Sequence, residues 1–307
     1  MNDRHEAAPL AIVTGANTGL GFETARGLVQ RGYRVIVAAR NPQKGRTAVE
    51  TLRAEFPEAT LRFEPLDLDS LDSVRDFAAT VQAQETTLDR LVNNAGLLAP
   101  PTRELTRDGF ERQLGVNYLG HFLLTSRLLP LLQAATAPRV VQLSSLAHRS
   151  GRIDFEDLNG ERDYDPWRAY RQSKLAMLLF SRALQRHSDA HGWGLVSVAA
   201  HPGLSRTALF EHGVRSRALV GSLFRVVMPL ISQSAADGAR PVLHAATGND
   251  VRPGDYFGPA GPWEARGAPK RARMITAARD PALADRLWDV SCKLTGAEWD
   301  APRDSAR

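Results

Sequence analysis

The stretch Leu10–Gly21 (LAIVTGANTGLG) decides the fold class. It opens with Leu10–Thr14, a short apolar and β-branched run that is typical of a buried strand. A turn with three glycines follows, and a helical pattern continues through Phe22–Gln30. Such a turn points free backbone N–H groups and the positive end of a helix dipole at one spot, which suits a phosphate group. The stretch therefore predicts an α/β protein with a phosphate-binding turn after its first strand.

The rest of the chain repeats this alternation of strands and helices. Strands are predicted at Leu10–Thr14, Arg34–Ala39, Leu61–Pro65, Leu88–Asn93, Arg139–Ser144 and Leu195–Ala200, with a short one at Tyr256–Phe257. Helices are predicted at Phe22–Gln30, Pro42–Phe56, Leu71–Ala83, Asp108–Leu132, Trp167–Arg186, Leu204–Leu230 and Ser234–Ala246. Right-handed crossovers between such strands give a doubly wound parallel sheet of about seven strands with helices on both faces. No repeat or linker interrupts the pattern, so we expect residues 1–307 to form a single domain.

Composition narrows the class of protein. Among 307 residues, 43% are hydrophobic and 24% charged, as in ordinary globular proteins. The single cysteine, Cys292, excludes an internal disulfide and a cysteine-cluster metal site, and it fits a reducing compartment. The N-terminal residues lack a signal-peptide pattern, and the apolar run Ala218–Ser232 is broken by Arg225 and Pro229. We therefore expect a cytoplasmic protein without a membrane span.

Two further features suggest no nucleic-acid or metal partner. The net charge is +5, but the basic residues are scattered along the chain. Their densest cluster, Arg266–Arg273 (RGAPKRAR), lacks interleaved aromatics and any nucleic-acid-binding motif, so we interpret it as a solvated loop. His187 and His191 have the i, i+4 spacing of a metal pair, but no third ligand is near them in the sequence. We predict neither a nucleic-acid partner nor a metal.

The glycine spacing, G-x-x-x-G-x-G, differs from the usual G-x-G-x-x-G and resembles the cofactor loop of the short-chain dehydrogenase/reductase family. Further motifs similar to that family follow in order: Asp67 in LDLDS, Asn93–Gly96 (NNAG), Asn117 in GVNYLGHF, Ser144–Ser145, Tyr170-x-x-x-Lys174, and His201–Gly203 (HPG) with Thr207. Tyr170 follows Ser145 by 25 positions, a long spacing that resembles the retinol-dehydrogenase-like branch. The resemblance implies a single Rossmann-fold domain in which residues 8–200 bind a dinucleotide and residues 201–300 bind the substrate.

The same resemblance implies a nicotinamide cofactor and residues that bind it. These are Gly15, Asn17, Thr18, Gly19, Leu20, Gly21, Arg40, Asp67, Leu68, Asn94, Ala95, Gly96, Tyr170, Lys174, Pro202, Gly203 and Thr207. Arg40 ends the second strand, where a carboxylate would accept a bond from the adenosine ribose 2′-OH and repel a 2′-phosphate. A guanidinium can instead bind that phosphate, which favours NADP(H). The alternative is that Arg40 stacks on adenine or caps a helix, which leaves NAD(H) open.

The candidate catalytic residues are Asn117, Ser145, Tyr170 and Lys174. Tyr170 and Lys174 are four positions apart, so they share one face of a helix. A neighbouring ammonium stabilises phenolate, and we expect it to lower the pKa of Tyr170 so that this residue can act as the acid/base. Ser145 directly follows the fifth strand, where it can polarise a carbonyl oxygen. In the family, the counterpart of Asn117 orients the lysine through water.

Together these motifs predict an NADP-dependent oxidoreductase that transfers a hydride between nicotinamide and a carbonyl or alcohol. If Leu204–Leu230 forms an apolar lid, and Leu146–Trp167 with His148 walls the pocket, the substrate is a retinoid, a steroid-like ketone or a lipid-derived aldehyde. One alternative is a non-catalytic dinucleotide-binding scaffold. Another is an enzyme acting on a sugar nucleotide, which would need a larger C-terminal part. The resemblance also suggests a homodimer or homotetramer, with helices Asp108–Leu132 and Trp167–Arg186 as interfaces.

Overall fold

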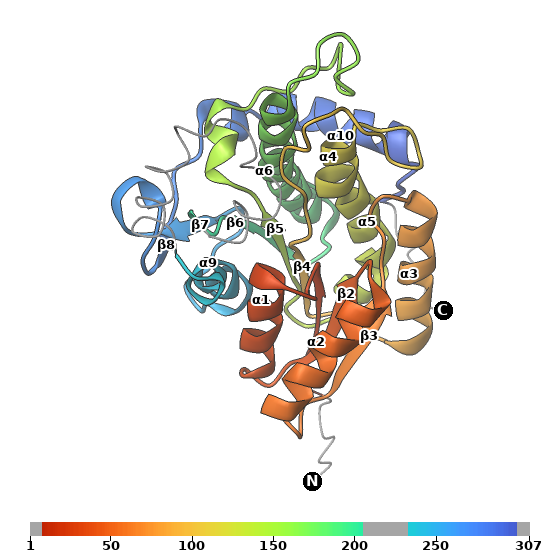
Figure 1. The fold of residues 1–307 in the computed structure, drawn as a ribbon, viewed down its shortest axis with the longest axis vertical. Coiled ribbons are helices and arrows are strands. Elements are labelled where there is room, and N and C mark those ends of the chain that lie inside the picture. The colour runs from red at the N-terminus through yellow and green to blue at the C-terminus, as the bar shows by residue number, and fades with distance from the viewer. Residues whose placement is uncertain (1–7, 205–232, 300–307) are drawn as a thin grey trace.

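The computed structural model describes residues 8–204 and 233–299, and its centre is one eight-stranded sheet (Figure 1). The strands are β1 (Leu10–Thr14), β2 (Arg34–Ala39), β3 (Leu61–Pro65), β4 (Arg90–Asn93), β5 (Arg139–Leu143), β6 (Val196–Ala200), β7 (Tyr256–Pro259) and β8 (Pro269–Arg271). They lie in the order β3-β2-β1-β4-β5-β6-β7-β8, so the winding direction reverses between β1 and β4. Open parallel sheets bind ligands at the carboxyl ends of the strands at such a reversal. The predicted doubly wound α/β fold is confirmed.

The predicted strand count of about seven is one too low, because the chain turns back after β7. Strands β1 to β7 pair in parallel, whereas β8 pairs antiparallel with β7, with Phe257 opposite Arg271 and Pro259 opposite Pro269. The connection between these two strands, residues 260–268, is too short for a helical crossover and forms a hairpin instead. The basic run Arg266–Arg273, expected to be a loop, therefore contributes the edge strand of the sheet.

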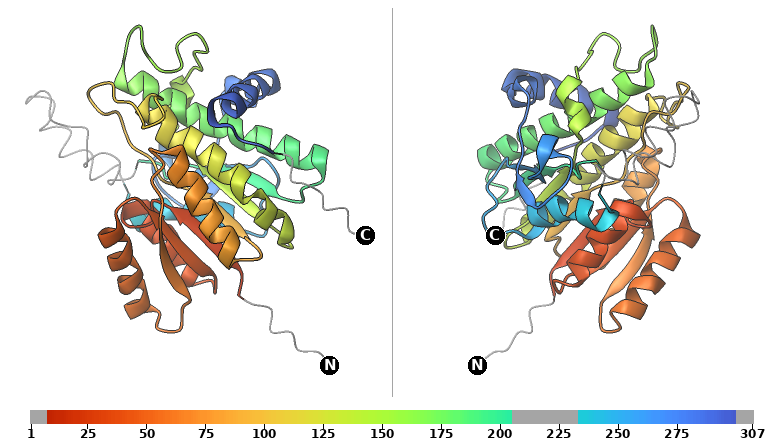
Figure 2. Two further views of the ribbon diagram at one scale, coloured as in Figure 1. Left: turned by 90° about the vertical axis from the view of Figure 1, so that its right-hand side faces the viewer. Right: turned by 60° about the vertical axis from the view of Figure 1, so that its left-hand side comes forward.

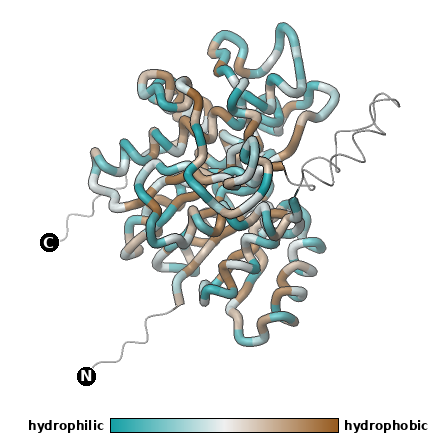
Figure 3. Tube along the Cα trace, turned by 90° about the vertical axis from the view of Figure 1, so that its left-hand side faces the viewer, coloured by the Kyte–Doolittle hydropathy of each residue, from teal (hydrophilic) through white to brown (hydrophobic). Residues whose placement is uncertain are grey.

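Helices cover both faces of the sheet (Figures 1 and 2). They are α1 (Gly19–Val29), α2 (Pro42–Glu55), α3 (Leu71–Gln84), α4 (Arg112–Leu114), α5 (Gly120–Ala134), α6 (Pro166–His191), α9 (Ala235–Thr247) and α10 (Pro281–Thr295). One hydrophobic core lies between the sheet and α1, α2 and α9, and a second lies between the sheet and α3, α5 and α6, with α10 packed outside α6. Figure 3 shows hydrophobic and hydrophilic residues alternating along the helices, the pattern of helices with one buried face.

Local signals in the sequence explain where several helices begin. Helices α2, α6 and α10 each start with proline after an asparagine or aspartate, and that side chain accepts a hydrogen bond from the first turn. Proline fits the first helical position because that residue has no intrahelical N–H bond to lose. Helix α6 ends at Gly192, which adopts a left-handed φ of 65° that favours glycine. This long helix fixes the orientation of Tyr170 and Lys174.

The predicted helix Asp108–Leu132 begins later than expected and is not uniform. Residues Leu105 and Glu111 form an isolated antiparallel bridge, and the Glu111 carboxylate caps α4. A π-helical turn, η1 (Gly115–Leu119), then separates α4 from α5. Such turns are common at functional sites, and this one carries Asn117.

Some predictions fall on residues outside the described part of the chain. They include most of the helix Leu204–Leu230 and the cofactor residue Thr207. Within the described part, 8–204 and 233–299, no helix is both long and apolar enough to cross a bilayer.

Candidate active site

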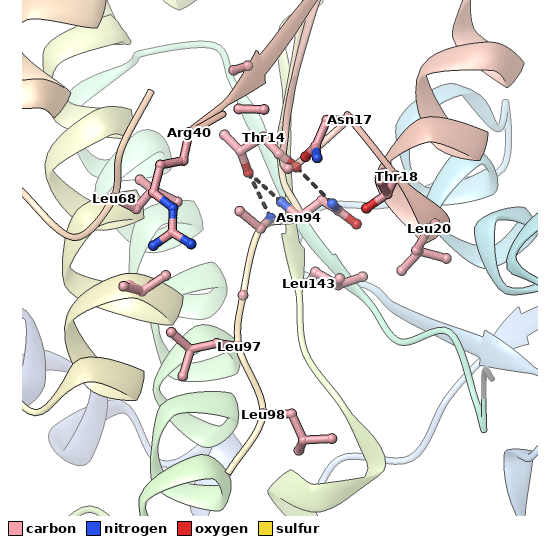
Figure 4. A pocket seen from close by; sticks show the side chains of 18 of the residues that line it. Thr14, Asn17, Thr18, Leu20, Arg40, Leu68, Asn94, Leu97, Leu98 and Leu143 are labelled. Atoms are coloured by element: carbon pink, nitrogen blue, oxygen red, sulfur yellow. Dashed lines mark hydrogen bonds between the residues drawn. The ribbon is translucent and has the colours of Figure 1, made fainter. Parts of the chain in front are cut away.

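A pocket of about 430 Å³ opens at the carboxyl ends of the parallel strands (Figure 4). It is lined by 17 of the predicted residues: Gly15, Asn17, Thr18, Gly19, Leu20, Gly21, Arg40, Asp67, Leu68, Asn94, Ala95, Gly96, Ser145, Tyr170, Lys174, Pro202 and Gly203. Most of these residues follow directly on the ends of β1 to β6, whereas Tyr170 and Lys174 belong to α6, so the pocket brings together segments far apart in the sequence. Two predicted site residues remain: Asn117 does not line the pocket, and Thr207 is outside the described residues.

The glycine turn after β1 has the features of an anion-binding site. Thr18 precedes α1 in an extended conformation without a side-chain cap, and the first turn of α1 holds no acidic residue. The helix N-terminus therefore offers backbone N–H groups to the pocket. A Cβ on Gly21 would lie 2.3 Å from the Gly15 carbonyl oxygen, so only glycine permits this tight turn. The cradle and its uncapped N–H groups fit the pyrophosphate of a dinucleotide.

Thr14 ties this turn to the loop after β4. Its hydroxyl oxygen accepts hydrogen bonds from the backbone N–H groups of Asn94 and Ala95, each at 2.9 Å. The Asn94 amide donates to the Thr14 carbonyl oxygen at 2.7 Å, as the dashed lines in Figure 4 show. Sequence reasoning missed Thr14, although its place as the last residue of β1 was the available signal.

Arg40 and Asp67 stand at the end of the pocket formed by β2 and β3. Arg40 is exposed and lines the pocket together with Leu68. The Asp67 carboxylate accepts a bond from the Asp69 N–H at 3.2 Å and lies 3.5 Å from the Arg107 guanidinium. This end of the pocket therefore presents a cation at the tip of β2, where an acidic residue would exclude a 2′-phosphate.

Tyr170 and Lys174 project from α6 into the opposite end of the pocket. Both are buried, and the Lys174 Nζ lies 5.8 Å from the centre of the Tyr170 ring. The Lys174 ammonium donates a hydrogen bond to the Leu143 carbonyl oxygen at 3.1 Å. Burial lowers the pKa of Lys174 to about 8, because an ammonium loses solvation in the interior.

The pKa of Tyr170 moves in the opposite direction from the one expected. Burial raises it, and the hydrogen bond with the Ser145 side chain lowers it by less. The predicted lowering by the ammonium is wrong for this geometry, because Lys174 is bonded to Leu143 and desolvation of the phenol dominates. Tyr170 is therefore a neutral phenol hydrogen-bonded to Ser145.

The two serines after β5 have different surroundings. The Ser144 hydroxyl donates to the Lys174 carbonyl oxygen at 2.8 Å, which anchors α6 to the strand end. The Ser145 hydroxyl oxygen accepts a bond from the Ala147 N–H at 3.2 Å and contacts Tyr170. Both serines line the pocket, but the Ser144 hydroxyl is bonded to the backbone of α6, and only the Ser145 hydroxyl is bonded to the phenol. Ser145 is therefore the serine placed to contact a substrate oxygen.

Asn117 does not line the pocket, and its side chain stabilises the loop after β4 through hydrogen bonds. Its side chain bonds both the N–H and the carbonyl oxygen of Leu97, at 2.8 and 3.1 Å, and donates to the Ser173 hydroxyl at 2.9 Å. A Cβ on Gly96 would lie 3.0 Å from the Asn117 side-chain oxygen and 3.4 Å from the Lys174 Nζ. Asn117 and Lys174 thus lie close together behind Gly96.

The expected pocket wall at Leu146–Trp167 is wrong, since none of these residues lines the pocket. Phe155 and Leu158 pack against the core beside the sheet, and His148 is buried with its Nδ1 2.6 Å from the Ser145 carbonyl oxygen. Apolar side chains are stabilised when their surface is removed from water, and packing against the core removes more of it than facing an open pocket would.

The apolar residues that do line the pocket come from strand ends and η1. Besides the predicted Leu20 and Leu68, they include Leu66, Leu97, Leu98, Val116 and Leu143. Leu97 and Leu98 follow the predicted NAG motif directly, so their position along the chain was the signal that sequence reasoning passed over. In the described residues, 8–204 and 233–299, no cluster of histidine, cysteine or acidic side chains could hold a metal.

The family model described as short chain dehydrogenase matches residues 9–217. The chain belongs to this family. Among related short-chain dehydrogenases, human retinol dehydrogenase 12 is 40% identical over 293 residues, which cover 95% of this chain and 87% of the relative. The retinol-dehydrogenase-like resemblance is thereby confirmed.

Solved structures agree with this assignment. A crystal structure of an uncharacterised protein from Mycobacterium paratuberculosis has a TM-score of 0.77 and 39% identity, covering 96% of this chain and 97% of that one. A short chain dehydrogenase from Shigella flexneri, solved in complex with NADP, has a TM-score of 0.64 and 25% identity, covering 83% of this chain and 96% of that one. This chain therefore has both the sequence and the fold of a short-chain dehydrogenase.

Proposed function

We propose that this short-chain dehydrogenase is an NADP(H)-dependent oxidoreductase that interconverts an apolar carbonyl compound and its alcohol. One observation carries the proposal: Ser145, Tyr170 and Lys174 line the same pocket as the glycine turn and Arg40. A phenol, a hydroxyl and an ammonium at one end, and an anion-binding turn at the other, fit a dinucleotide whose reactive ring reaches the phenol.

Different residues of the pocket would bind different parts of the cofactor. The turn Gly15–Gly21 would hold the pyrophosphate, Arg40 the 2′-phosphate, and Asp67 and Leu68 the adenine ring. Lys174 would hold the hydroxyls of the nicotinamide ribose. When bound, NADP(H) supplies or accepts the hydride. The NADP in the related Shigella structure supports the choice of this cofactor over NAD(H).

Tyr170 and Ser145 would handle the substrate oxygen. In reduction, the Ser145 hydroxyl donates a hydrogen bond to the carbonyl oxygen, and the Tyr170 phenol transfers its proton to that oxygen. A raised pKa keeps the phenol protonated at neutral pH, as this step requires. In oxidation the same proton returns from the alcohol to Tyr170.

The pocket wall supports an apolar substrate. Leu97, Leu98, Val116 and Leu143 present hydrocarbon beside Tyr170 and Ser145, and a retinol dehydrogenase is among the relatives. An apolar alcohol or aldehyde buries its chain against such a surface and leaves its oxygen to the polar residues.

The direct test is a panel of aldehydes and ketones, including retinal and linear aldehydes, with NADPH or NADH as the reductant. We expect oxidation of NADPH with apolar carbonyls and much slower reaction with small polar ones. Binding of NADPH without turnover on any carbonyl would favour the non-catalytic scaffold instead.

We also propose a location in the cell and an oligomeric state. The single cysteine supports a cytoplasmic location, which cell fractionation would test. A homodimer or homotetramer is proposed from the family resemblance, with α5 and α6 as interfaces, and light scattering of the purified chain would measure it.

A further inference from the structure

The connection between β7 and β8 (Figure 1) carries a buried carboxylate, Glu264, which the proposed reaction does not use. Its φ is 59° and that of Trp263 is 52°, both in the left-handed region that non-glycine residues rarely adopt. Trp263 is 83% exposed, whereas Glu264 is 7% exposed. The strained turn therefore directs the carboxylate into the protein, and strain of this kind persists only where the surroundings hold it.

Inside the protein, this carboxylate joins three segments. One oxygen, Oε2, accepts from the His201 Nε2 at 3.0 Å and from the Arg149 guanidinium at 2.8 Å. The other oxygen accepts the Arg273 N–H at 3.3 Å. Arg149 lies in the turn η2 (Leu146–Ser150) that follows Ser145, and His201 directly precedes Pro202 and Gly203 of the pocket wall. The hairpin is thus bonded to both segments that flank the proposed reacting groups.

The hydrogen bonds of His201 fix the position of its proton. Its Nδ1 accepts the backbone N–H of Gly203 at 3.2 Å, so the proton lies on Nε2 and is donated to Glu264. Burial lowers the pKa of His201 and outweighs the opposing effect of Glu264, which keeps the ring neutral. A polar chain therefore runs from the Gly203 peptide through the imidazole to the carboxylate.

The surrounding backbone is shaped around this chain of contacts. A Cβ on Gly258 would lie 1.9 Å from the His201 Nε2, so β7 leaves room for the ring only because it has glycine there. Gly203 has a φ of 67°, and a Cβ on it would lie 2.3 Å from the Ala265 carbonyl oxygen. The next residue, Leu204, donates its N–H to that same oxygen at 2.9 Å. Gly203 is held from both sides, by the imidazole and by the hairpin.

We propose that Glu264 and His201 form a positioning pair that sets the Gly203 peptide against the nicotinamide end of the pocket and, through Arg149, fixes this wall relative to the Ser145 turn. Neither side chain lines the pocket, so the pair acts through Gly203 and Arg149 and not by contact with cofactor or substrate. The inference rests on the proposed function, because a nicotinamide must bind beside Gly203 for its position to matter.

The test compares two buried glutamates that each pair with cations. In E264Q the new amide places a donor opposite either His201 or Arg149, whereas in E85Q the same change breaks contacts with Arg34 and Arg62 at the amino ends of β2 and β3. We expect both variants to lose thermal stability. Only E264Q should weaken NADPH binding, with a Kd about tenfold higher in a fluorescence titration. A tenfold change is the typical effect of losing a hydrogen bond to a charged group. Equal NADPH affinity in E264Q and E85Q would overturn the pair.

Two variants of His201 test the same link without changing Glu264. In H201N the amide oxygen can still accept the Gly203 N–H, as in an Asx-turn, whereas H201L can make neither contact. We expect H201N to retain more NADPH affinity than H201L at similar thermal stability. Identical affinities in the two variants would contradict the proposal.

The wild-type chain separates failure of the pair from failure of the function. If the wild-type chain binds neither NADPH nor NADH, both the proposed function and the positioning pair are wrong. If the wild-type chain binds NADPH, and E264Q and H201L bind it equally well, only the proposed positioning pair is wrong.

Discussion

Tyr170 and Lys174 are both buried, and burial moves their pKa values in opposite directions. It raises the pKa of Tyr170 and lowers that of Lys174 to about 8. Both shifts favour the uncharged form, since the interior solvates charge poorly. A neutral phenol can donate a proton to a carbonyl oxygen, so Tyr170 is already in the protonated form that the reduction needs.

The lowered pKa of Lys174 predicts a pH-dependent stability. Between the folded pKa of about 8 and the ordinary value of 10.5, the unfolded chain carries a proton on this residue that the folded chain has lost. Stability therefore rises with pH in this window. We expect wild type to gain about 2 kcal/mol relative to K174M between about pH 7 and about pH 9.5, as measured by urea denaturation. A difference that stays constant with pH would show that Lys174 titrates normally.

Arg40 predicts the cofactor preference. R40E would place a carboxylate at the end of β2, where it repels a 2′-phosphate and accepts a bond from a 2′-hydroxyl. We expect the KM for NADPH to rise about tenfold or more, because a charge-assisted bond is replaced by repulsion, while the KM for NADH stays equal or falls. The matched control is R46E, an exposed arginine on α2 outside the pocket. If both variants raise the KM for NADPH alike, the effect is one of net charge and Arg40 makes no specific contact.

Among the elements, the parallel strands and their helices were predictable because their signals are local. The apolar run between Pro9 and Gly15 predicted β1, and Pro42 marked the start of α2, since proline chemistry acts within a few residues. The strand β8 and the π-helical turn at Asn117 gave no such signal. They depend on hairpin pairing with β7 and on contacts with the loop at Leu97, which periodicity does not report.

The candidate site shows the same division. Motif residues could be placed in the pocket because the ends of parallel strands meet at one edge of the sheet. The pKa direction of Tyr170 could not be predicted, because it depends on burial and on where the Lys174 ammonium points. The contact between Glu264 and His201 was equally hidden, since 63 residues separate them in the chain.

The start of α6 yields a prediction about this element. The Asp165 side chain accepts the Arg168 N–H at 2.5 Å and caps the helix that carries Tyr170. We expect D165A to lower the free energy of unfolding by about 1 kcal/mol, the usual value of such a cap. D163A, which removes an exposed partner of Arg168, should cost less than about 0.5 kcal/mol. Equal losses in chemical denaturation would mean that the cap contributes nothing specific.

For the whole molecule, the pocket at the reversal point of the sheet predicts coupling between cofactor binding and stability. NADPH would contact the ends of β1 to β6, and a ligand that binds only the folded state stabilises it by mass action. At about 100 times its Kd, NADPH should add about 2.7 kcal/mol, seen as a rise in Tm. NADH at the same concentration should raise the Tm less. A larger shift with NADH would reverse the proposed cofactor preference.

The most direct test of Tyr170 as the proton donor is the effect of Y170F on NADPH binding and on turnover, measured on one preparation. Removing the hydroxyl removes the proposed proton donor but leaves the ring that packs beside Lys174 and Trp167. We expect Y170F to bind NADPH within about twofold of wild type, a difference of well under 1 kcal/mol. We also expect the rate of reduction of an apolar aldehyde to fall by a factor of at least about 100, the lower range for loss of a general acid. Turnover close to that of wild type would contradict the role of Tyr170, because the proton would then come from another group.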